Sequence, residues 1–174
     1  MDISDINPHQ DGETHINIYS NSKCEIGRLL SNFAYSPFTH KKYGKFNSVE
    51  GLWYYIKTGC QYDKLRKLHG IEAKKEGKKL SENVLFNDSD DNNHFREDIK
   101  EGIRQKLREN KYILNKLCET GSLPITHYYV WYAKVGDGYN ARDAGGEWII
   151  KEVERIRTLA QKYLENKKGI SFNT

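Results

Sequence analysis

FNSVEGLWYYIK, residues 46–57, predicts a helix that carries an acid, three aromatic side chains and a lysine within about three turns. Glu50 and Lys57 lie seven residues apart, so the helix places both on one face. Trp53 and Tyr54 fall between them on the same face. A helix that only packs on a core would carry aliphatic side chains there. We therefore expect this helix to line a cleft with a proton donor or acceptor, a stacking surface and an amine.

The length and composition of the chain indicate a single compact globular domain. Its 174 residues are enough to bury roughly two thirds of the unfolded surface. Only 37% of the residues are hydrophobic, but 12 Tyr, 6 Phe and 3 Trp supply bulky side chains for a core. We expect a loose N-terminal segment at 1–14, the domain at 15–166 and a C-terminal tail at 167–174.

Charge and cysteine content favour a cytoplasmic protein that is compatible with an anionic ligand. The formal net charge is +4, and lysines cluster between residues 64 and 79. This cluster either contacts phosphates or forms a solvated helix face, because acidic residues are interleaved with the lysines. Three widely spaced cysteines predict free thiols in a reducing compartment. Without a signal peptide, a membrane-length apolar run or metal-ligand spacing, we expect no membrane, metal or cofactor.

Hydrophobic periodicity along the rest of the chain predicts a mostly helical α+β domain, with five or six helices around a few short strands. Asn47 or Ser48 is the natural N-cap of the first helix. Further helices are expected within 62–80 with a break at Gly70, at 95–107, at 112–117, and from 146 to the C-terminus. Strands are expected at 15–19, 43–46 and 126–132. The remaining segments are expected to be a mixture of loop and short strand at 28–38, and irregular at 87–93 and 135–146.

Four short blocks in a fixed order span most of the chain, from residue 19 to residue 157. They are L-S-N-F at 30–33 with P-F at 37–38, S-V-E at 48–50 with a lysine seven residues after the glutamate, V-G-D-G at 135–138, and a glycine before three apolar residues at 146–150. In order and spacing this set resembles the NADAR family, also called the YbiA-like family. Its members are N-glycosidases associated with NAD and ADP-ribose chemistry.

Three positions depart from the pattern of that family. The family usually has His after the glutamate, Trp at the start of the third block and Asn in the last block. The corresponding residues here are Gly51, Val135 and Asp143. Trp131 and Tyr132 could replace the missing indole, so the resemblance supports the chemistry better than the substrate.

The resemblance implies cleavage of an N-glycosidic bond at the anomeric carbon of a ribose. A carboxylate stabilises the oxocarbenium-like state of such a reaction, and the departing base needs a proton. Glu50 can serve both needs, although it also fits a capping box that starts at Asn47. Lys57 can act as a nucleophile that forms a Schiff base with an opened ribose, the alternative being a solvated lysine at a helix end.

The resemblance also implies a set of ligand-binding residues, each with an ordinary structural alternative. Trp53 and Tyr54 would otherwise be core aromatics, and Asp137 a turn residue. The cations would otherwise be solvated, and Arg142 is a further candidate for contact with phosphate. The ligand-binding set is Arg28, Ser31, Asn32, Phe33, Ser48, Trp53, Tyr54, Trp131, Lys134, Gly136, Asp137, Gly138 and Asp143.

Three functions are compatible with these residues. The first is an N-glycosidase that removes ADP-ribose from modified guanine bases in single-stranded or duplex DNA. The lysine-rich helices would bind the DNA strand. The size and lysine content would suit a phage-encoded counter-defence protein in the host cytoplasm. The second is a metabolite-repair N-glycosidase for small N-ribosides such as flavin-pathway intermediates, which would not need a basic surface. The third is a non-catalytic ADP-ribose binding module, and none of the three implies an obligate protein partner.

Overall fold

The computed structural model describes residues 3–87 and 94–171. It confirms the predicted fold class, which is α+β with mostly helical residues. Contacts within the chain group into two compact units, which are described separately. The central unit is Leu29–Lys111, and the terminal unit joins Met1–Arg28 to Tyr112–Thr174. The boundaries expected for the domain, 15–166, stay a prediction.

The described residues contain six α-helices, three short 3₁₀-helices and three two-stranded sheets. The α-helices are α1 (Glu25–Leu30), α2 (Val49–Lys57), α3 (Gly70–Leu80), α4 (Phe95–Glu109), α5 (Lys111–Glu119) and α6 (Glu147–Ser171). The 3₁₀-helices are η1 (Ile3–Asp5), η2 (Pro8–Gln10) and η3 (Asp63–Lys67). The sheets are β1 (Ile16–Asn17) parallel to β4 (Ile125–Thr126), β2 (Phe38–His40) antiparallel to β3 (Gly44–Phe46), and β5 (Tyr128–Tyr132) antiparallel to β6 (Tyr139–Asp143).

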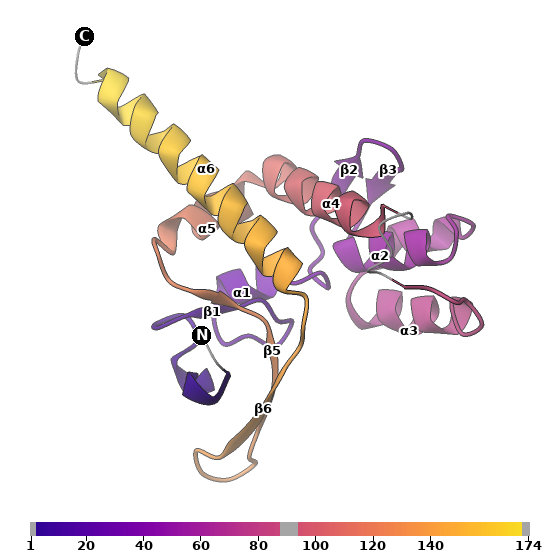
Figure 1. The fold of residues 1–174 in the computed structure, drawn as a ribbon, viewed down its shortest axis with the longest axis horizontal. Coiled ribbons are helices and arrows are strands. Elements are labelled where there is room, and N and C mark those ends of the chain that lie inside the picture. The colour runs from indigo at the N-terminus through magenta and orange to yellow at the C-terminus, as the bar shows by residue number, and fades with distance from the viewer. Residues whose placement is uncertain (1–2, 88–93, 172–174) are drawn as a thin grey trace. The chain divides into compact units, whose positions relative to one another are not determined.

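In the central unit, α2 is packed closely against α3 and α4 (Figure 1). A glycine on each neighbouring helix permits this approach. A Cβ atom on Gly77 of α3 would lie 2.0 Å from the Tyr54 ring, and one on Gly102 of α4 would lie 2.4 Å from Leu52. Leu68, just before α3, has its carbonyl beside Gly51 near the start of α2, so α2 and α3 run in the same general direction.

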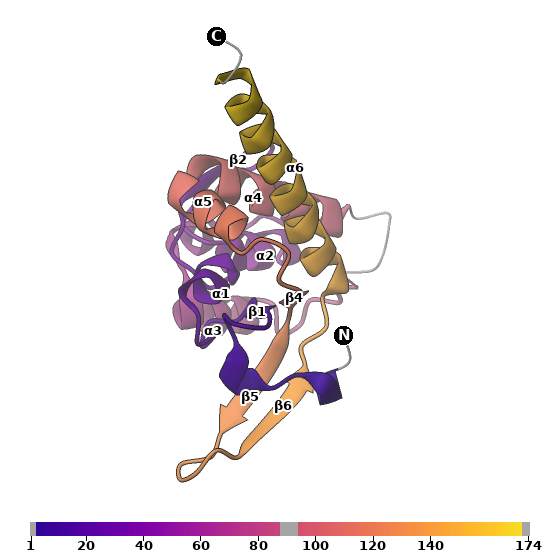
Figure 2. The same ribbon diagram turned by 90° about the vertical axis from the view of Figure 1, so that its left-hand side faces the viewer.

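In the terminal unit, β5 and β6 form a long twisted hairpin, and the N-terminal segment lies beside it (Figure 2). One face of the hairpin is buried, since Tyr128 and Val130 pack in a cluster with Ile6. Farther along the chain, α6 contacts β4, and Arg157 donates a hydrogen bond of 2.7 Å to the carbonyl of Leu123. No helix among the described residues has the length and apolar character needed to cross a membrane.

Two of the expected segments are wrong in part. The stretch 28–38 does not begin as loop or strand, because α1 runs through Leu30 and buries Ile26 and Leu30, four residues apart, on one face. The glycine-rich stretch 135–146 is not irregular throughout, because β6 pairs with β5 along five residues. Its glycines at 136 and 138 lie in the connection between the strands, where they leave the pairing intact.

Most other elements fall where the sequence predicts them. The break before α3 coincides with Gly70, whose φ of +55° favours glycine. The strand expected at 126–132 is split between β4 and β5 at His127. Between residues 3 and 14, where we expected a loose segment, the structure has η1 and η2, and Asn7 caps η2. The loop expected at 87–93 and the end of the tail, 172–174, lie outside the described residues except for residue 87.

Candidate active site

The start of α2 is fixed by Ser48, which leaves the Glu50 side chain outside the helix cap. The Ser48 hydroxyl accepts a hydrogen bond of 3.0 Å from the amide of Gly51 and donates one of 2.9 Å to the carbonyl of Leu68. Asn47 instead donates its side-chain amide to the carbonyl of Lys67. The capping-box alternative for Glu50 is therefore wrong, because Ser48 is the N-cap and Glu50 is one residue too early for that motif.

The Glu50 carboxyl is buried beside two lysines of α3. The residue is 9% exposed, and burial raises the pKa of this carboxyl to about 7, while Lys74 and Lys78 act to lower it. Among the described residues, none donates a hydrogen bond to its carboxyl oxygens. A carboxyl that titrates near neutral pH can both donate and accept a proton during a reaction.

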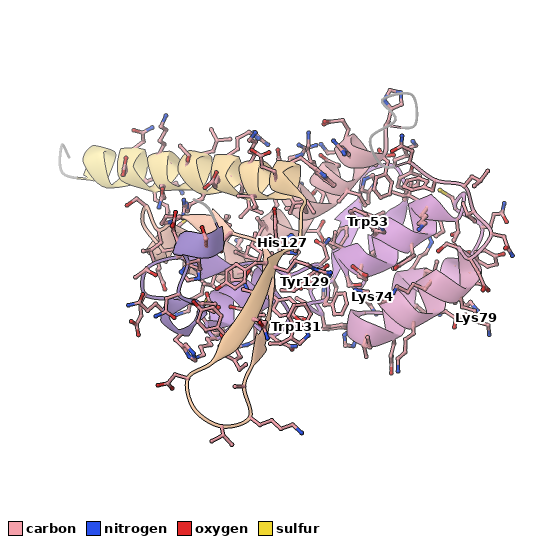
Figure 3. All side chains as sticks on the ribbon, turned by 60° about the horizontal axis from the view of Figure 1, so that its bottom comes forward. Trp53, Lys74, Lys79, His127, Tyr129 and Trp131 are labelled. Carbon is pink, nitrogen blue, oxygen red and sulfur yellow. The ribbon has the colours of Figure 1, made fainter. Side chains whose placement is uncertain are left out.

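The Ser31–Ala34 turn, which overlaps the L-S-N-F block, is bonded to the backbone of Glu50 and of the start of α3. The amide of Glu50 donates to the carbonyl of Asn32 at 2.9 Å, and the amide of Gly70 donates to the carbonyl of Phe33 at 2.9 Å. The ammonium of Lys74 lies 5.3 Å from the centre of the Phe33 ring, within the range of a cation–π contact. The structure thus brings together the turn, Glu50 and Lys74, which Figure 3 labels on α3.

Lys106 of α4 holds the same turn and was not singled out from the sequence. Its ammonium donates to the carbonyls of Leu30 and Ser31 at 3.3 and 2.9 Å, and the side chain is 1% exposed. Burial lowers the pKa of this amine to about 7. One signal was available in the sequence, because Lys106 follows Ile103 by three residues and so lies on the apolar face of α4.

Lys57, the predicted nucleophile, lies at the opposite end of α2 from Glu50. It lines an open hollow of about 390 Å³ together with Thr58, Tyr62, Leu80 and Phe86, and Glu50 is not part of that lining. The ammonium of Lys57 lies 6.0 Å from the centre of the Phe86 ring. The structure therefore does not group Lys57 with Glu50, and its role as a nucleophile stays a prediction.

The two aromatic residues between Glu50 and Lys57 differ in burial. Tyr54 is 7% exposed and packs against Gly77, so it is a core residue of the α2–α3 contact. Trp53 is half-buried, and its ring meets Phe95 edge-on with the ring centres 4.7 Å apart. The sequence could not decide which of the two would serve the core.

Steric contacts explain why position 51 holds a glycine here, where the sequence pattern of the NADAR family usually has a histidine. A Cβ atom at this position would lie 2.4 Å from the carbonyl oxygen of Leu65 and 3.2 Å from that of Leu68. The backbone between α2 and α3 thus occupies the space that a side chain would need. A histidine cannot replace Gly51 here unless that segment moves.

The remaining predicted ligand residues belong to the terminal unit. Arg28 donates to the carbonyls of Ser22 and Lys23, so its guanidinium is used within the fold. Trp131 is 53% exposed. The carboxyl of Asp143 accepts from the amide of Gly145 at 2.8 Å and so closes a turn. Lys134, Gly136, Asp137 and Gly138 lie in the exposed connection between β5 and β6, where the carbonyl of Asp137 bonds to the ring of His9 at 2.9 Å.

The described groups near the start of α2 that can take part in chemistry include the Glu50 carboxyl and the amines of Lys74 and Lys78. Within residues 3–87 and 94–171, no group of three or more His, Cys, Asp or Glu side chains gathers as a metal site would require. The three cysteines are free thiols, and burial raises the pKa of each. The geometry thus supplies general acid–base groups and possible amine nucleophiles.

Comparison with solved structures places this fold beside that of a bacterial protein. The NMR structure of the Escherichia coli protein YbiA matches with a TM-score of 0.53 and 16% sequence identity, over 91% of this chain and 92% of that chain. At this level of identity the likeness shows a shared fold. Neither the family models nor the curated proteins that we searched gave a match.

Proposed function

We propose that the chain is an N-glycosidase that hydrolyses an N-ribosidic bond, and that its substrate is ADP-ribose attached to guanine in DNA. One observation carries the proposal: a buried carboxyl, Glu50, lies at the start of α2 beside the Ser31–Ala34 turn and the lysines of α3. The sequence blocks that resemble the NADAR family include both this glutamate and this turn. The fold shared with YbiA is consistent with the same assignment.

In the proposed reaction, Glu50 acts first as an acid and then as a base. The bond between the anomeric carbon and the base nitrogen breaks, its electron pair stays on the nitrogen, and the Glu50 carboxyl supplies the proton that nitrogen needs. The resulting carboxylate stabilises the oxocarbenium-like carbon. Water then adds to that carbon and returns a proton to Glu50, which releases ADP-ribose and restores the acid.

A covalent variant of this route uses a lysine amine. When the ribose ring opens, its ring oxygen becomes a hydroxyl and C1 forms an imine with the base nitrogen. The lysine amine adds to C1 and gives its protons to the base nitrogen, the bond from C1 to that nitrogen breaks, and C1 is left as a Schiff base of the lysine. Water then hydrolyses this Schiff base, which releases ADP-ribose and restores the amine. Lys57 is the amine expected from the sequence. Lys74 is a second candidate, favoured by its position near the Phe33 ring and by its effect on the Glu50 carboxyl.

The charge distribution supports a nucleic acid as the carrier of the ADP-ribose. Most of the lysines and arginines lie in the central unit, whereas the acids are divided evenly between the two units. Lys75, Lys78 and Lys79 are exposed on α3, the helix that also carries Lys74. Such a surface suits phosphates. We propose that the protein is encoded by a phage and acts in the host cytoplasm, where it removes ADP-ribose that the host has attached to DNA.

A substrate panel tests the proposal. The protein is incubated with an ADP-ribosylated oligonucleotide and with small N-ribosides, and release of ADP-ribose or ribose phosphate is followed by chromatography. We expect turnover of the oligonucleotide, and a loss of turnover in Glu50→Gln but not in Glu72→Gln, whose carboxyl is exposed on α3. Turnover of the small N-ribosides alone would instead identify a metabolite-repair enzyme. Binding of ADP-ribose with no turnover of any substrate would identify a binding module.

Borohydride reduction during turnover distinguishes the hydrolytic route from the covalent one. A Schiff base becomes a stable amine on reduction, and peptide mass spectrometry then locates it. An adduct on Lys57 would confirm the amine expected from the sequence, whereas an adduct on Lys74 would assign the nucleophile to α3. Turnover without any adduct would leave Glu50 and water as the reacting groups.

A further inference from the structure

One face of the β5–β6 hairpin carries a row of flat side chains. His127, Tyr129 and Trp131 alternate along the chain, so they point to the same side of the strand, and Figure 3 labels all three. The ring centres of His127 and Tyr129 are 6.1 Å apart, and those of Tyr129 and Trp131 are 6.3 Å apart. Trp131, at the outer end, is 53% exposed.

A guanidinium completes this row. Arg142 is paired with Tyr129 across the hairpin, so its side chain lies on the same face. Its guanidinium carbon is 5.6 Å from the centre of the Tyr129 ring and 5.9 Å from that of Trp131. One planar cation therefore bridges two neighbouring rings, which restrains them without covering the outer part of Trp131. We refer to His127, Tyr129, Trp131 and Arg142 as the aromatic face.

The inner part of the aromatic face packs within the terminal unit, since the Tyr129 ring meets that of Tyr19 with the ring centres 5.6 Å apart and His127 bonds to the carbonyl of Gly145. The core of this unit does not need Trp131. The opposite face supplies that core, because Tyr128 and Val130 are 2% and 7% exposed and pack with Ile6. A polar residue at position 131 would leave this packing unchanged. The half-exposed indole is therefore better explained by a ligand than by stability.

We propose that the aromatic face binds the unpaired bases of a single nucleic-acid strand by stacking, an inference that rests on the proposed action on DNA and extends it to the state of the strand. Every base has a flat π-face that stacks on Trp or Tyr, and a guanidinium adds cation–π attraction. A duplex hides those base faces and offers only edges in its grooves. The exposed Trp131 ring, at the outer end of the row, thus matches a splayed base and does not match a paired one.

The charges around the hairpin give this binding a distinct signature. Lys134 and Arg142 are balanced by Asp137 and Asp143 along the same hairpin. Few counterions are released when a strand binds to a surface with no net charge, so this contribution changes little with salt concentration. Contacts of the α3 lysines with phosphates would show the opposite behaviour.

The test uses unmodified DNA, so that it does not depend on catalysis. Fluorescently labelled oligo(dT), a duplex of equal length and oligo(rU) are titrated with the protein at two salt concentrations, and binding is followed by anisotropy. For Trp131→Ala we expect about tenfold weaker binding of the single strand at both concentrations, because the stacking of one base is lost. Trp131→Phe, which retains a ring, should recover most of the affinity.

Tyr163→Ala is the matched control. Tyr163 on α6 is 59% exposed and also has a cation over its ring, since the ammonium of Lys167 lies 5.0 Å from the ring centre. We expect this variant to bind as the parent protein does. Equal binding of oligo(rU) would support the stacking site and identify RNA as a second source of unpaired bases. Unchanged affinity for the single strand in Trp131→Ala, or an equal loss of affinity for the duplex in that variant, would overturn the inference.

The outcomes separate this inference from the proposed function. If no substrate is turned over but Trp131→Ala still weakens strand binding, the glycosidase proposal fails and the stacking site stands. If ADP-ribosylated DNA is turned over but Trp131→Ala binds strands normally, the glycosidase proposal stands and the stacking site fails.

Discussion

The two ends of α2 differ sharply, although the sequence aligns Glu50 and Lys57 on one helical face. The first end is closed, because Glu50 is 9% exposed and its amide is bonded to the Ser31–Ala34 turn. The second end is open, because Lys57 lines a hollow of about 390 Å³. Seven residues of helix span about 10 Å, so one face can serve two separate environments.

The neighbours of α2 cause this difference. At the first end, the turn and the lysines of α3 surround Glu50, and Lys106 fixes the turn from α4. At the second end, Lys57 lines the hollow together with Leu80 and Phe86. Helical spacing sets the direction of a side chain, whereas the packing partners decide its solvation and therefore its pKa.

The largest effect is expected from Glu50→Gln, which removes the acid from the closed end. Loss of a general acid–base group should lower turnover of the substrate by about 100- to 10,000-fold with little effect on binding, because the amide keeps the shape of the side chain. Initial rates and KM for ADP-ribosylated oligonucleotide measure this. If Glu50→Gln retains the parent rate, the closed end is not the site of the chemistry.

The contrast between the two ends also shows how far the sequence could predict this protein. The α2 helix, the break at Gly70 and the amphipathic α4 follow from local patterns, since each depends on spacing and on glycine. The loss of a capping box at Glu50 does not, because it depends on the long-range contact of Ser48 with Leu68.

Two further features depended on residues distant in sequence. One is the hydrogen bond between the buried ammonium of Lys106 and the carbonyl of Ser31, which joins residues that are 75 positions apart in the sequence. The strand β6 was missed because its residues are polar and follow glycines, and only pairing with β5 makes them a strand. The blocks that resemble the NADAR family still indicated the turn and the glutamate before any packing was known.

The two buried groups at the closed end, the Glu50 carboxyl and the Lys106 amine, should make the free energy of unfolding depend on pH. Burial raises the pKa of Glu50 from 4.5 to about 7, so its contribution to folding is fully present below pH 4.5 and is lost as pH rises through 7. Glu50→Gln should therefore be more stable than the parent at pH 8, by roughly 3 kcal/mol, with the difference shrinking toward pH 5. Urea unfolding followed by circular dichroism at several pH values measures this difference.

The contribution of Lys106 to stability changes with pH in the opposite direction to that of Glu50. Burial lowers the pKa of its amine from 10.5 to about 7, so its contribution is fully present above pH 10.5 and is lost as pH falls through 7. The stability of Lys106→Met relative to the parent should thus be highest below pH 7 and should decline above it, whatever the constant cost of losing the two hydrogen bonds to the turn. Lys100→Met, on the more exposed side of α4, is the control and should give a difference that does not vary over this range. Histidine contributions cancel in each comparison, because the variants share them.

The smallest expected effect is a change in the pKa of the Glu50 carboxyl when a lysine at one end of α2 or the other is replaced. Lys74 stabilises the ionised form of Glu50, so Lys74→Met should raise the pKa of Glu50 further, by a fraction of a unit. Lys57→Met should leave it unchanged, because Lys57 is not among the charges that act on this carboxyl. Carbon-13 NMR of the labelled glutamate side chains measures both values. An equal rise in the two variants would show that the amine of Lys57 reaches the closed end in solution, and the two ends of α2 would then form one site, as the spacing of Glu50 and Lys57 first indicated.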